Sequence, residues 1–108
     1  MDTFIINNVS WIVKYVPPTD SSLWRAITGK YALGCCDNVN KAIYINNSLD
    51  KTLSKKVLGH EITHAAMFSY NVNLTIEQEE LVADLIATYG DEIIYITNKI
   101  FNKLREGY

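Results

Sequence analysis

The segment 57–70, VLGHEITHAAMFSY, contains both histidines of the chain, four positions apart, with a glutamate directly after the first. Residues four apart on an α-helix share one face, so the imidazoles of His60 and His64 can bind the same metal ion. Glu61 then lies beside the ion, where its carboxylate can take a proton from an attacking water and return it to a leaving amine. This spacing is typical of helices that bind a catalytic zinc ion.

The chain has no further histidine, so the third zinc ligand must be a carboxylate, a cysteine or only water. Peptidase classes that complete the site with a third histidine are thereby excluded. In TIEQEELVADLIATYG, Glu80 and Asp84 share a helix face, so one can bind zinc while the other accepts a hydrogen bond from a ligand imidazole. We expect Glu80 to be the ligand. Glu77 and Glu79 are the alternatives, with Glu79 expected to point further from the site.

The pattern His-x-x-x-His with an internal glutamate also occurs by accident, as a helix with two packed or exposed histidines. The flanking residues favour a metal site, because those between and after the two histidines are uncharged and no proline interrupts the helix. For stabilising a carbonyl oxygen during hydrolysis, the chain offers only tyrosine, lysine or arginine. The tyrosine candidates are Tyr31, Tyr44, Tyr70, Tyr89 and Tyr95, and the sequence favours none of them.

The first third of the chain reads as β-structure. Segments 3–6 and 9–16 are rich in β-branched and aromatic residues and are separated by Asn7-Asn8, which predicts a hairpin. GKYALGCC and KAIYINN, joined by DNVN, predict a second hairpin. Between the hairpins, residues 20–27 are expected to form a helical turn that packs Leu23, Trp24 and Ile27.

Helical periodicity begins after residue 47. The first helix is expected to start at a Thr52 or Ser54 cap and to run to about residue 70. Thr75 and Gln78 form a capping box for a second helix, 76–89, and Gly90 is expected to end it. A third helix, 91–105, is expected to pack its apolar residues, which are Ile93, Ile94, Ile96, Ile100, Phe101 and Leu104. The fold class is therefore α+β, with a small, mostly antiparallel N-terminal sheet followed by three helices, the first of which carries His60, Glu61 and His64.

The composition is that of an ordinary soluble protein. A chain of 108 residues has room for one domain, 1–108, and a net charge of -2 gives no electrostatic basis for binding nucleic acid or an anionic membrane. No signal-like or membrane-spanning run is present, so we expect a cytoplasmic protein. Cys35 and Cys36 are adjacent, which predicts reduced thiols rather than a disulfide or a zinc-binding pair.

HEITH followed by Glu80-Leu-Val-Ala-Asp84 resembles the gluzincin arrangement. The layout of KAIYIN, VLGHEITHA and a helix with E-x-x-A-D is most similar to the ImmA/IrrE-like metallopeptidases of phages and mobile elements. The resemblance covers about residues 28–90 and implies a minimal zincin-like metallopeptidase domain. It implies that His60, His64 and Glu80 bind Zn²⁺, that Glu61 catalyses, and that Asp84 orients a ligand histidine.

The sequence thus favours a zinc metalloendopeptidase acting on a protein or peptide substrate, with no nucleic-acid or membrane partner. The alternative is a non-catalytic metal-binding or interaction protein of phage or mobile-element origin, and a third possibility is a metal-free binding domain. Glu61 separates the first two, because hydrolysis requires this carboxylate and a structural zinc site does not. The sequence leaves the substrate and the oligomeric state open.

Overall fold

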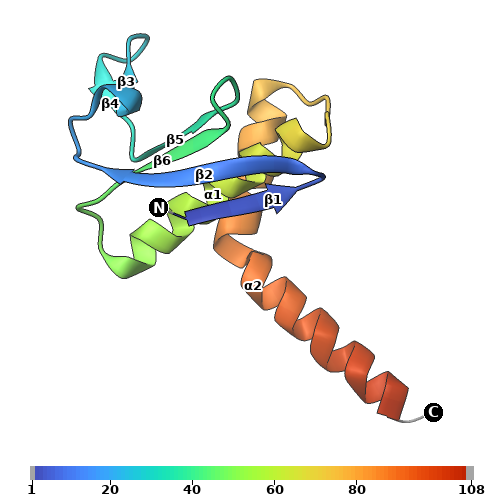
Figure 1. Ribbon diagram of the computed structural model, residues 1–108. Coiled ribbons are helices and arrows are strands. Elements are labelled where there is room, and N and C mark those ends of the chain that lie inside the picture. Colours follow the sequence, from blue (N-terminus) through green and yellow to red (C-terminus); the bar gives the residue numbers. More distant parts are fainter. Residues whose placement is uncertain (1, 107–108) are drawn as a thin grey trace.

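The computed structural model describes residues 2–106 and is an α+β fold, as predicted. Helix α1 lies against one face of a four-stranded sheet, and α2 packs on α1 and then extends away from the rest of the chain (Figure 1). The elements are β1 (Asp2–Ile6), β2 (Val9–Val16), the 3-10 helix η1 (Ser21–Leu23), β3 (Trp24–Arg25), β4 (Lys30–Tyr31), β5 (Gly34–Asp37), β6 (Ala42–Asn46), α1 (Lys51–Ser69) and α2 (Ile76–Glu106).

The sheet has the strand order β1-β2-β6-β5 and contains both predicted hairpins. The β1–β2 and β5–β6 pairs are antiparallel, whereas β2 and β6 are parallel. Asn7 and Asn8 have φ angles of 48° and 63°, the positive values that a tight two-residue hairpin turn requires. The short strands β3 and β4 form a separate antiparallel pair. Strand β6 therefore lies inside the sheet, and β5 forms the edge next to α1.

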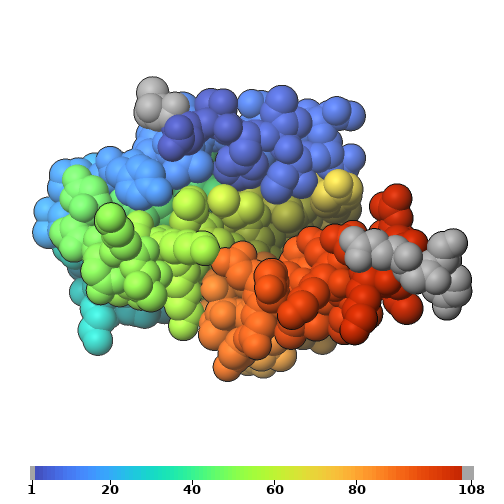
Figure 2. Space-filling view, turned by 90° about the horizontal axis from the view of Figure 1, so that it is seen from below, coloured from blue at the N-terminus to red at the C-terminus, as the bar shows by residue number. Residues whose placement is uncertain are grey.

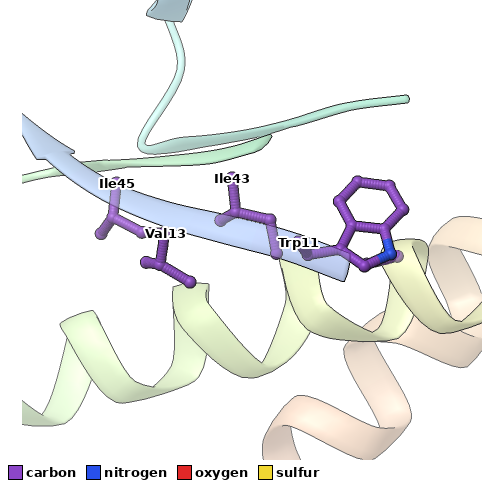
Figure 3. Close-up of a cluster of buried hydrophobic side chains, with 5 residues drawn as sticks. Trp11, Val13, Ile43 and Ile45 are labelled. Atoms are coloured by element: carbon purple, nitrogen blue, oxygen red, sulfur yellow. The ribbon is translucent and has the colours of Figure 1, made fainter. Parts of the chain in front are cut away.

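The core lies between the sheet and α1. Trp11 and Val13 of β2, together with Ile43 and Ile45 of β6, are buried against the helix (Figure 3). Such nearly complete burial of branched and aromatic side chains is the main stabilising contribution in a domain of this size. The core fixes the face that α1 turns to the sheet, and therefore also the face that carries the histidines.

Of the turn expected to pack Leu23, Trp24 and Ile27, only part is buried. Leu23 is fully buried, but Trp24 is 47% exposed and Ile27 is fully exposed. The reason is that the helical segment is a single 3-10 turn, after which the chain leaves the core to form the small β3–β4 ribbon. The Trp24 ring packs edge-on against Tyr31 across this ribbon instead, with ring centroids 5.0 Å apart.

The two helix starts differ in how well the sequence predicted them. Asp50, rather than Thr52 or Ser54, caps α1, because its carboxylate accepts a hydrogen bond from the Leu53 backbone N–H at 2.8 Å. The predicted capping box of α2 is confirmed. The Thr75 hydroxyl accepts from the backbone N–H of residue 78, and the Gln78 side chain accepts from the backbone N–H of residue 75.

The prediction of three helices was wrong, because α2 continues through Gly90 as one helix of 31 residues. A glycine inside a helix costs only about 1 kcal/mol relative to alanine, so a single one need not end a helix that is otherwise favourable. Gly90 lies on the side of α2 that faces α1, where the neighbouring Ala87 packs closely on Gly59. The absence of large side chains there allows the two helices to approach closely.

The predicted packing of the C-terminal apolar residues was also wrong. Every residue from 91 to 105 is exposed, including Ile93, Ile96 and Ile100. The reason is geometric, because α1 has only 19 residues and runs antiparallel to α2, so that Lys55 near its start already pairs with Asp91 at 2.6 Å. The rest of α2 overhangs, and the radius of gyration is 16.0 Å rather than the roughly 13 Å of a compact chain of this length. Neither helix, in the part of the chain described, is long and apolar enough to span a membrane.

Candidate metal centre

Helix α1 turns one face to the sheet and another to α2. Ala65 faces the sheet and is fully buried, whereas His60 and His64 point toward the first turns of α2. The hairpin between the helices is short, and α2 therefore returns antiparallel along the histidine face. His64, nearer the hairpin, meets the start of α2, and His60 meets residues one turn further along.

Glu80 lies opposite both histidines. One of its carboxylate oxygens is 3.1 Å from Nε2 of His60, and the other is 2.9 Å from Nε2 of His64. The two Nε2 atoms are themselves 3.1 Å apart. A Glu61 carboxylate oxygen also lies within 4.8 Å of a ring nitrogen of each histidine, but the Glu80 oxygens are closer to both. The structure thus brings His60, His64 and Glu80 to one point and places Glu61 beside it.

Each histidine has a carboxylate at its other ring nitrogen. Nδ1 of His60 is 2.9 Å from Asp84, and Nδ1 of His64 is 2.6 Å from Glu79. We had expected Glu79 to point away from the site, but its side chain is only 18% exposed. The antiparallel register explains the difference, since the residue preceding Glu80 is the one that lies level with His64. The short loop between the helices was the sequence signal that could have identified Glu79, because it determines which residue of α2 lies level with His64.

The hydrogen bonds at Nδ1 determine what the Nε2 atoms can do. Because a carboxylate only accepts, each Nδ1 carries the proton that it donates, to Asp84 in one case and to Glu79 in the other. In a neutral imidazole, Nε2 then presents a lone pair. Two such lone pairs and the Glu80 carboxylate converge on one point, which is favourable only if a cation, either a metal ion or protons, lies among them.

The dimensions of this cluster fit zinc. With ligand distances of about 2.0–2.1 Å, two ligand atoms of a tetrahedral zinc ion are roughly 3.3 Å apart. The two Nε2 atoms are 3.1 Å apart, and each lies 3.1 or 2.9 Å from one of the two Glu80 carboxylate oxygens, which is close to this value. Carboxylate partners on the distal nitrogens are the usual companions of zinc-binding histidines. The donor set can therefore hold a divalent ion with little rearrangement.

Glu61 is the most buried acidic residue near the site, with 5% of its surface exposed. Its Oε2 is the buried side-chain atom without a hydrogen-bond partner among residues 2–106. Burial raises the pKa of the Glu61 carboxyl, and the nearby His64 and His60 oppose part of this shift. A buried carboxylate with a free oxygen next to a cation site is suited to accept a proton from a water molecule there.

Gly34 at the start of β5 holds the edge strand close to Glu61. A Cβ at this position would lie 2.7 Å from a Val57 methyl carbon and 3.0 Å from Glu61 Cγ. We expect Gly34→Ala to lower the free energy of unfolding by roughly 1–3 kcal/mol, because α1 and β5 must separate to admit the methyl group. Urea denaturation measures this loss.

Gly59→Ala is the matched control for this prediction. Its added Cβ would meet Ala87 at 3.6 Å, an ordinary contact, and alanine is the better helix former by about 1 kcal/mol. We therefore expect Gly59→Ala to be neutral or stabilising. Equal destabilisation by both substitutions would contradict the close approach of β5 to α1.

Two hollows flank the cluster, and Arg25 lines both. One, of about 290 Å³, also includes Cys36, Glu61 and His64, and the other, of about 400 Å³, includes His60 and Asp84. Arg25 comes from the β3–β4 ribbon, and its charge favours the ionised form of Glu61. An arginine was among the residue types expected to stabilise a carbonyl oxygen, but the sequence alone could not identify Arg25. Nothing in the sequence indicated that the β3–β4 ribbon lies near the histidines.

The other sequence candidates lie outside the hollows. No tyrosine among the described residues lines either one. Cys35 and Cys36 are both unpaired, as predicted. Burial raises the pKa of the Cys36 thiol to about 12, so that it is protonated at neutral pH and is a poor metal ligand.

A family comparison accounts for most of this architecture. Residues 22–90 match the Peptidase_M78 model, described as the IrrE N-terminal-like domain. The chain belongs to this family. The matched segment includes the β3–β4 ribbon, the β5–β6 hairpin, α1 and the first half of α2, and thus every residue of the cluster. Searches of curated proteins and of solved structures gave no significant match.

Membership of the IrrE N-terminal-like family confirms the resemblance inferred from HEITH and the helix that follows. It identifies a metallopeptidase-like domain, and within that domain His60, Glu61 and His64 form a group that can hold a metal ion. The match stops at residue 90, where the exposed half of α2 begins.

The Glu79 contact leads to a prediction about metal affinity in this IrrE N-terminal-like domain. Glu79→Gln removes the charge that orients His64 but keeps the shape of the side chain, so we expect zinc to bind about 10–100-fold more weakly. Competition with a chromophoric chelator measures the change. Glu77→Gln removes the same charge at an exposed position two residues earlier and should leave the affinity within about twofold. Unchanged affinity in Glu79→Gln would contradict the role of this contact.

Proposed function

We propose that this domain is a zinc-dependent metallopeptidase that hydrolyses peptide bonds in a protein substrate. In this proposal His60, His64 and Glu80 bind zinc, Glu61 is the general base, and Asp84 and Glu79 orient the two histidines. The observation that carries it is the convergence of two Nε2 atoms and the Glu80 carboxylate on one point, with the carboxylate of Glu61 beside it. Three protein ligands leave a position open for water and substrate, as catalytic zinc sites do.

A zinc ion held by His60, His64 and Glu80 would lower the pKa of a bound water molecule and polarise the carbonyl group of the substrate. Glu61 accepts the proton of the attacking water at its free carboxylate oxygen and then donates it to the departing amine nitrogen. The burial that raises the pKa of Glu61 favours its proton-carrying form between these two transfers. Asp84 and Glu79 keep the Nδ1 protons in place, and with them the orientation of both imidazoles.

We assign to Arg25 the role of stabilising the carbonyl oxygen of the substrate. The guanidinium is on the ribbon facing α1 and borders the hollows on both sides of the cluster. A fixed positive charge that faces the developing negative oxygen stabilises the transition state more than the ground state. None of the described tyrosines borders these hollows, and Lys56 borders only one of them, which leaves Arg25 as the donor best positioned for this role.

Strand β5 offers the substrate a place to bind. It is the sheet edge next to Glu61, and an extended peptide can pair with its free backbone groups as an additional strand. Strand β6 is paired on both sides and has no free edge for a peptide. The small hollows beside β5 suit an exposed, extended protein segment better than an enclosed small molecule.

The second candidate is a metal-binding protein without catalytic activity. The burial of Glu61 argues against it, because a domain gains nothing structural from a buried carboxylate oxygen that has no partner. Reaction with an exposed, unstructured substrate distinguishes the two. We would incubate the zinc-loaded chain with a randomised peptide library and with unfolded casein and identify new termini by mass spectrometry.

The proposal predicts cleavage that stops with a chelator and returns when zinc is added back. Zinc binding at one ion per chain, with no new termini in the library or in casein, would favour the non-catalytic candidate. Cleavage that persists undiminished in Glu61→Gln would contradict Glu61 as the general base.

A further inference from the structure

Helix α2 carries a regular apolar stripe from residue 86 to residue 100. Ile86, Tyr89, Ile93, Ile96 and Ile100, here called the α2 seam, follow one another at spacings of three, four, three and four residues. Each of these side chains is about half exposed, between 46% and 55%. Alternating spacings of three and four are the pattern by which one helix packs along another in a coiled coil.

Most of the seam lies in the part of α2 that does not pack against its own domain. From residue 91 to 105 no described residue is buried, and the segment is rich in isoleucine, which favours helix less than leucine or alanine does. A lone helix of about 15 residues is marginal in water even with good helix formers. Residues 91–105 therefore gain little stability from their own domain, and a partner that covers the seam would stabilise them.

The seam continues into a groove on the globular part. This groove, of about 890 Å³, lies between Leu58 and Ile62 of α1 and Leu85, Ile86 and Ile93 of α2. Its lining is predominantly apolar, and on α2 it extends from Leu85 to Ile94. Figure 2 shows α2, coloured orange to red, running from the globular part to the edge of the molecule. An apolar helix laid along the seam would enter the groove at one end.

Charge along α2 indicates which helix fits. Residues 76–92 include six acidic and no basic residues, whereas residues 93–105 include three basic and no acidic residues. Most of these acidic side chains lie on the face of α2 away from the seam, but Glu92 flanks the seam on the same side as Lys99. Two antiparallel copies of α2 bring Glu92 of each beside Lys99 of the other, whereas parallel copies do not bring these two residues together. The acidic half also makes an anionic membrane surface a poor partner for this helix.

We propose that the α2 seam binds a second copy of this chain, with the two α2 helices antiparallel. When Ile93 of one copy faces Ile96 of the other, Tyr89 faces Ile100, and the end of each overhang enters the partner's apolar groove. The same register places Glu92 beside Lys99 of the other copy, twice in the symmetric pair. Two equivalent copies, related by a twofold axis, then cover both overhangs at once.

This interface leaves the metal cluster open. On a helix with about 100° between residues, Glu80 and Asp84 lie nearly opposite the α2 seam. The inference therefore does not depend on the proposed activity, and zinc binding remains a measure of folding in every variant that tests the interface.

The test is the molar mass of the full-length chain in solution, measured by sedimentation velocity over a range of concentrations. We expect a monomer–dimer equilibrium in which Ile93→Glu raises the dissociation constant at least about tenfold, because a charge replaces a central apolar contact. Ile27→Glu, a fully exposed residue on the β3–β4 ribbon, is the control and should leave the constant unchanged.

Charge reversal tests the antiparallel register. Glu92→Lys and Lys99→Glu, made separately, should each weaken the dimer a few-fold to about tenfold, and together they should restore it. A parallel dimer, in which these two positions do not meet, would show no restoration. A chain that is monomeric at every concentration, or that gains mass only with lipid vesicles, would overturn the proposal.

Discussion

Glu61→Gln is expected to abolish peptide hydrolysis while zinc still binds. The amide keeps the size of the carboxylate but cannot accept a proton from water. We therefore expect kcat to fall by about 10²–10⁴-fold, the usual contribution of a general base. Glu61 is buried beside the histidines, and its substitution by an isosteric amide leaves His60, His64 and Glu80 in place. The rate is measured on a peptide cut by the parent, and the zinc content is measured on the same samples.

The control for Glu61→Gln is Glu77→Gln, which removes a carboxylate from the exposed start of α2 without approaching the cluster. Its activity should stay within about twofold of the parent, since it alters only a surface charge. If Glu61→Gln kept more than about a tenth of the parent activity, Glu61 would not be the base. If it lost zinc, its main role would be to hold the site together rather than to move protons.

Trp11→Ala is expected to give the largest loss of stability, about 3–5 kcal/mol. The indole is 1% exposed and stacks between Phe4 and Phe68, and its Nε1–H donates to the Ser69 hydroxyl at 2.9 Å. Its removal leaves a cavity between β2 and the end of α1, and the Ser69 hydroxyl, which still donates to the Ala65 carbonyl at 2.7 Å, loses the hydrogen bond that it accepts. Because a domain of this size has a free energy of unfolding of only about 5–15 kcal/mol, urea denaturation will detect the change easily.

Ile5→Ala is the matched substitution on the neighbouring strand, where the side chain is 70% exposed. It should change the free energy of unfolding by less than about 1 kcal/mol, because little apolar surface returns to water. A loss in Trp11→Ala no larger than the loss in Ile5→Ala would mean that the indole does not anchor α1 to the sheet. Added zinc should stabilise the parent in the same experiment, because binding favours the folded state.

The sequence predicted the sheet better than the helices. Alternating apolar residues and the Asn7-Asn8 turn are local signals, and both hairpins formed where they indicated. Gly90 is also a local signal, but one glycine costs a helix only about 1 kcal/mol, and the close packing of Ala87 on Gly59 of α1 supports the helix just before it. Periodicity identified the apolar stripe of the overhang, yet it cannot distinguish a stripe that packs within one chain from one that lies exposed.

The site was predicted to the extent that it depends on spacing within one helix. His60 and His64 share a face because they are four residues apart, and Glu80 and Asp84 share one for the same reason. Glu79 was missed because its contact depends on how two helices are aligned, and Arg25 because its position depends on a ribbon more than 30 residues away from His60 in sequence. Contacts between separate elements can be identified only when the tertiary structure is known.

The measurement that tests the central claim most directly is the amount of zinc bound per chain in the parent, in Glu80→Ala and in Glu77→Ala, with circular dichroism to verify folding. The account predicts about one zinc ion per chain in the parent and in Glu77→Ala, and a loss of binding or a much weakened affinity in Glu80→Ala alone. Glu80→Ala binding zinc as tightly as the parent would contradict Glu80 as the third ligand. No zinc in a folded, reconstituted parent would contradict the metal site and with it the proposed peptidase activity.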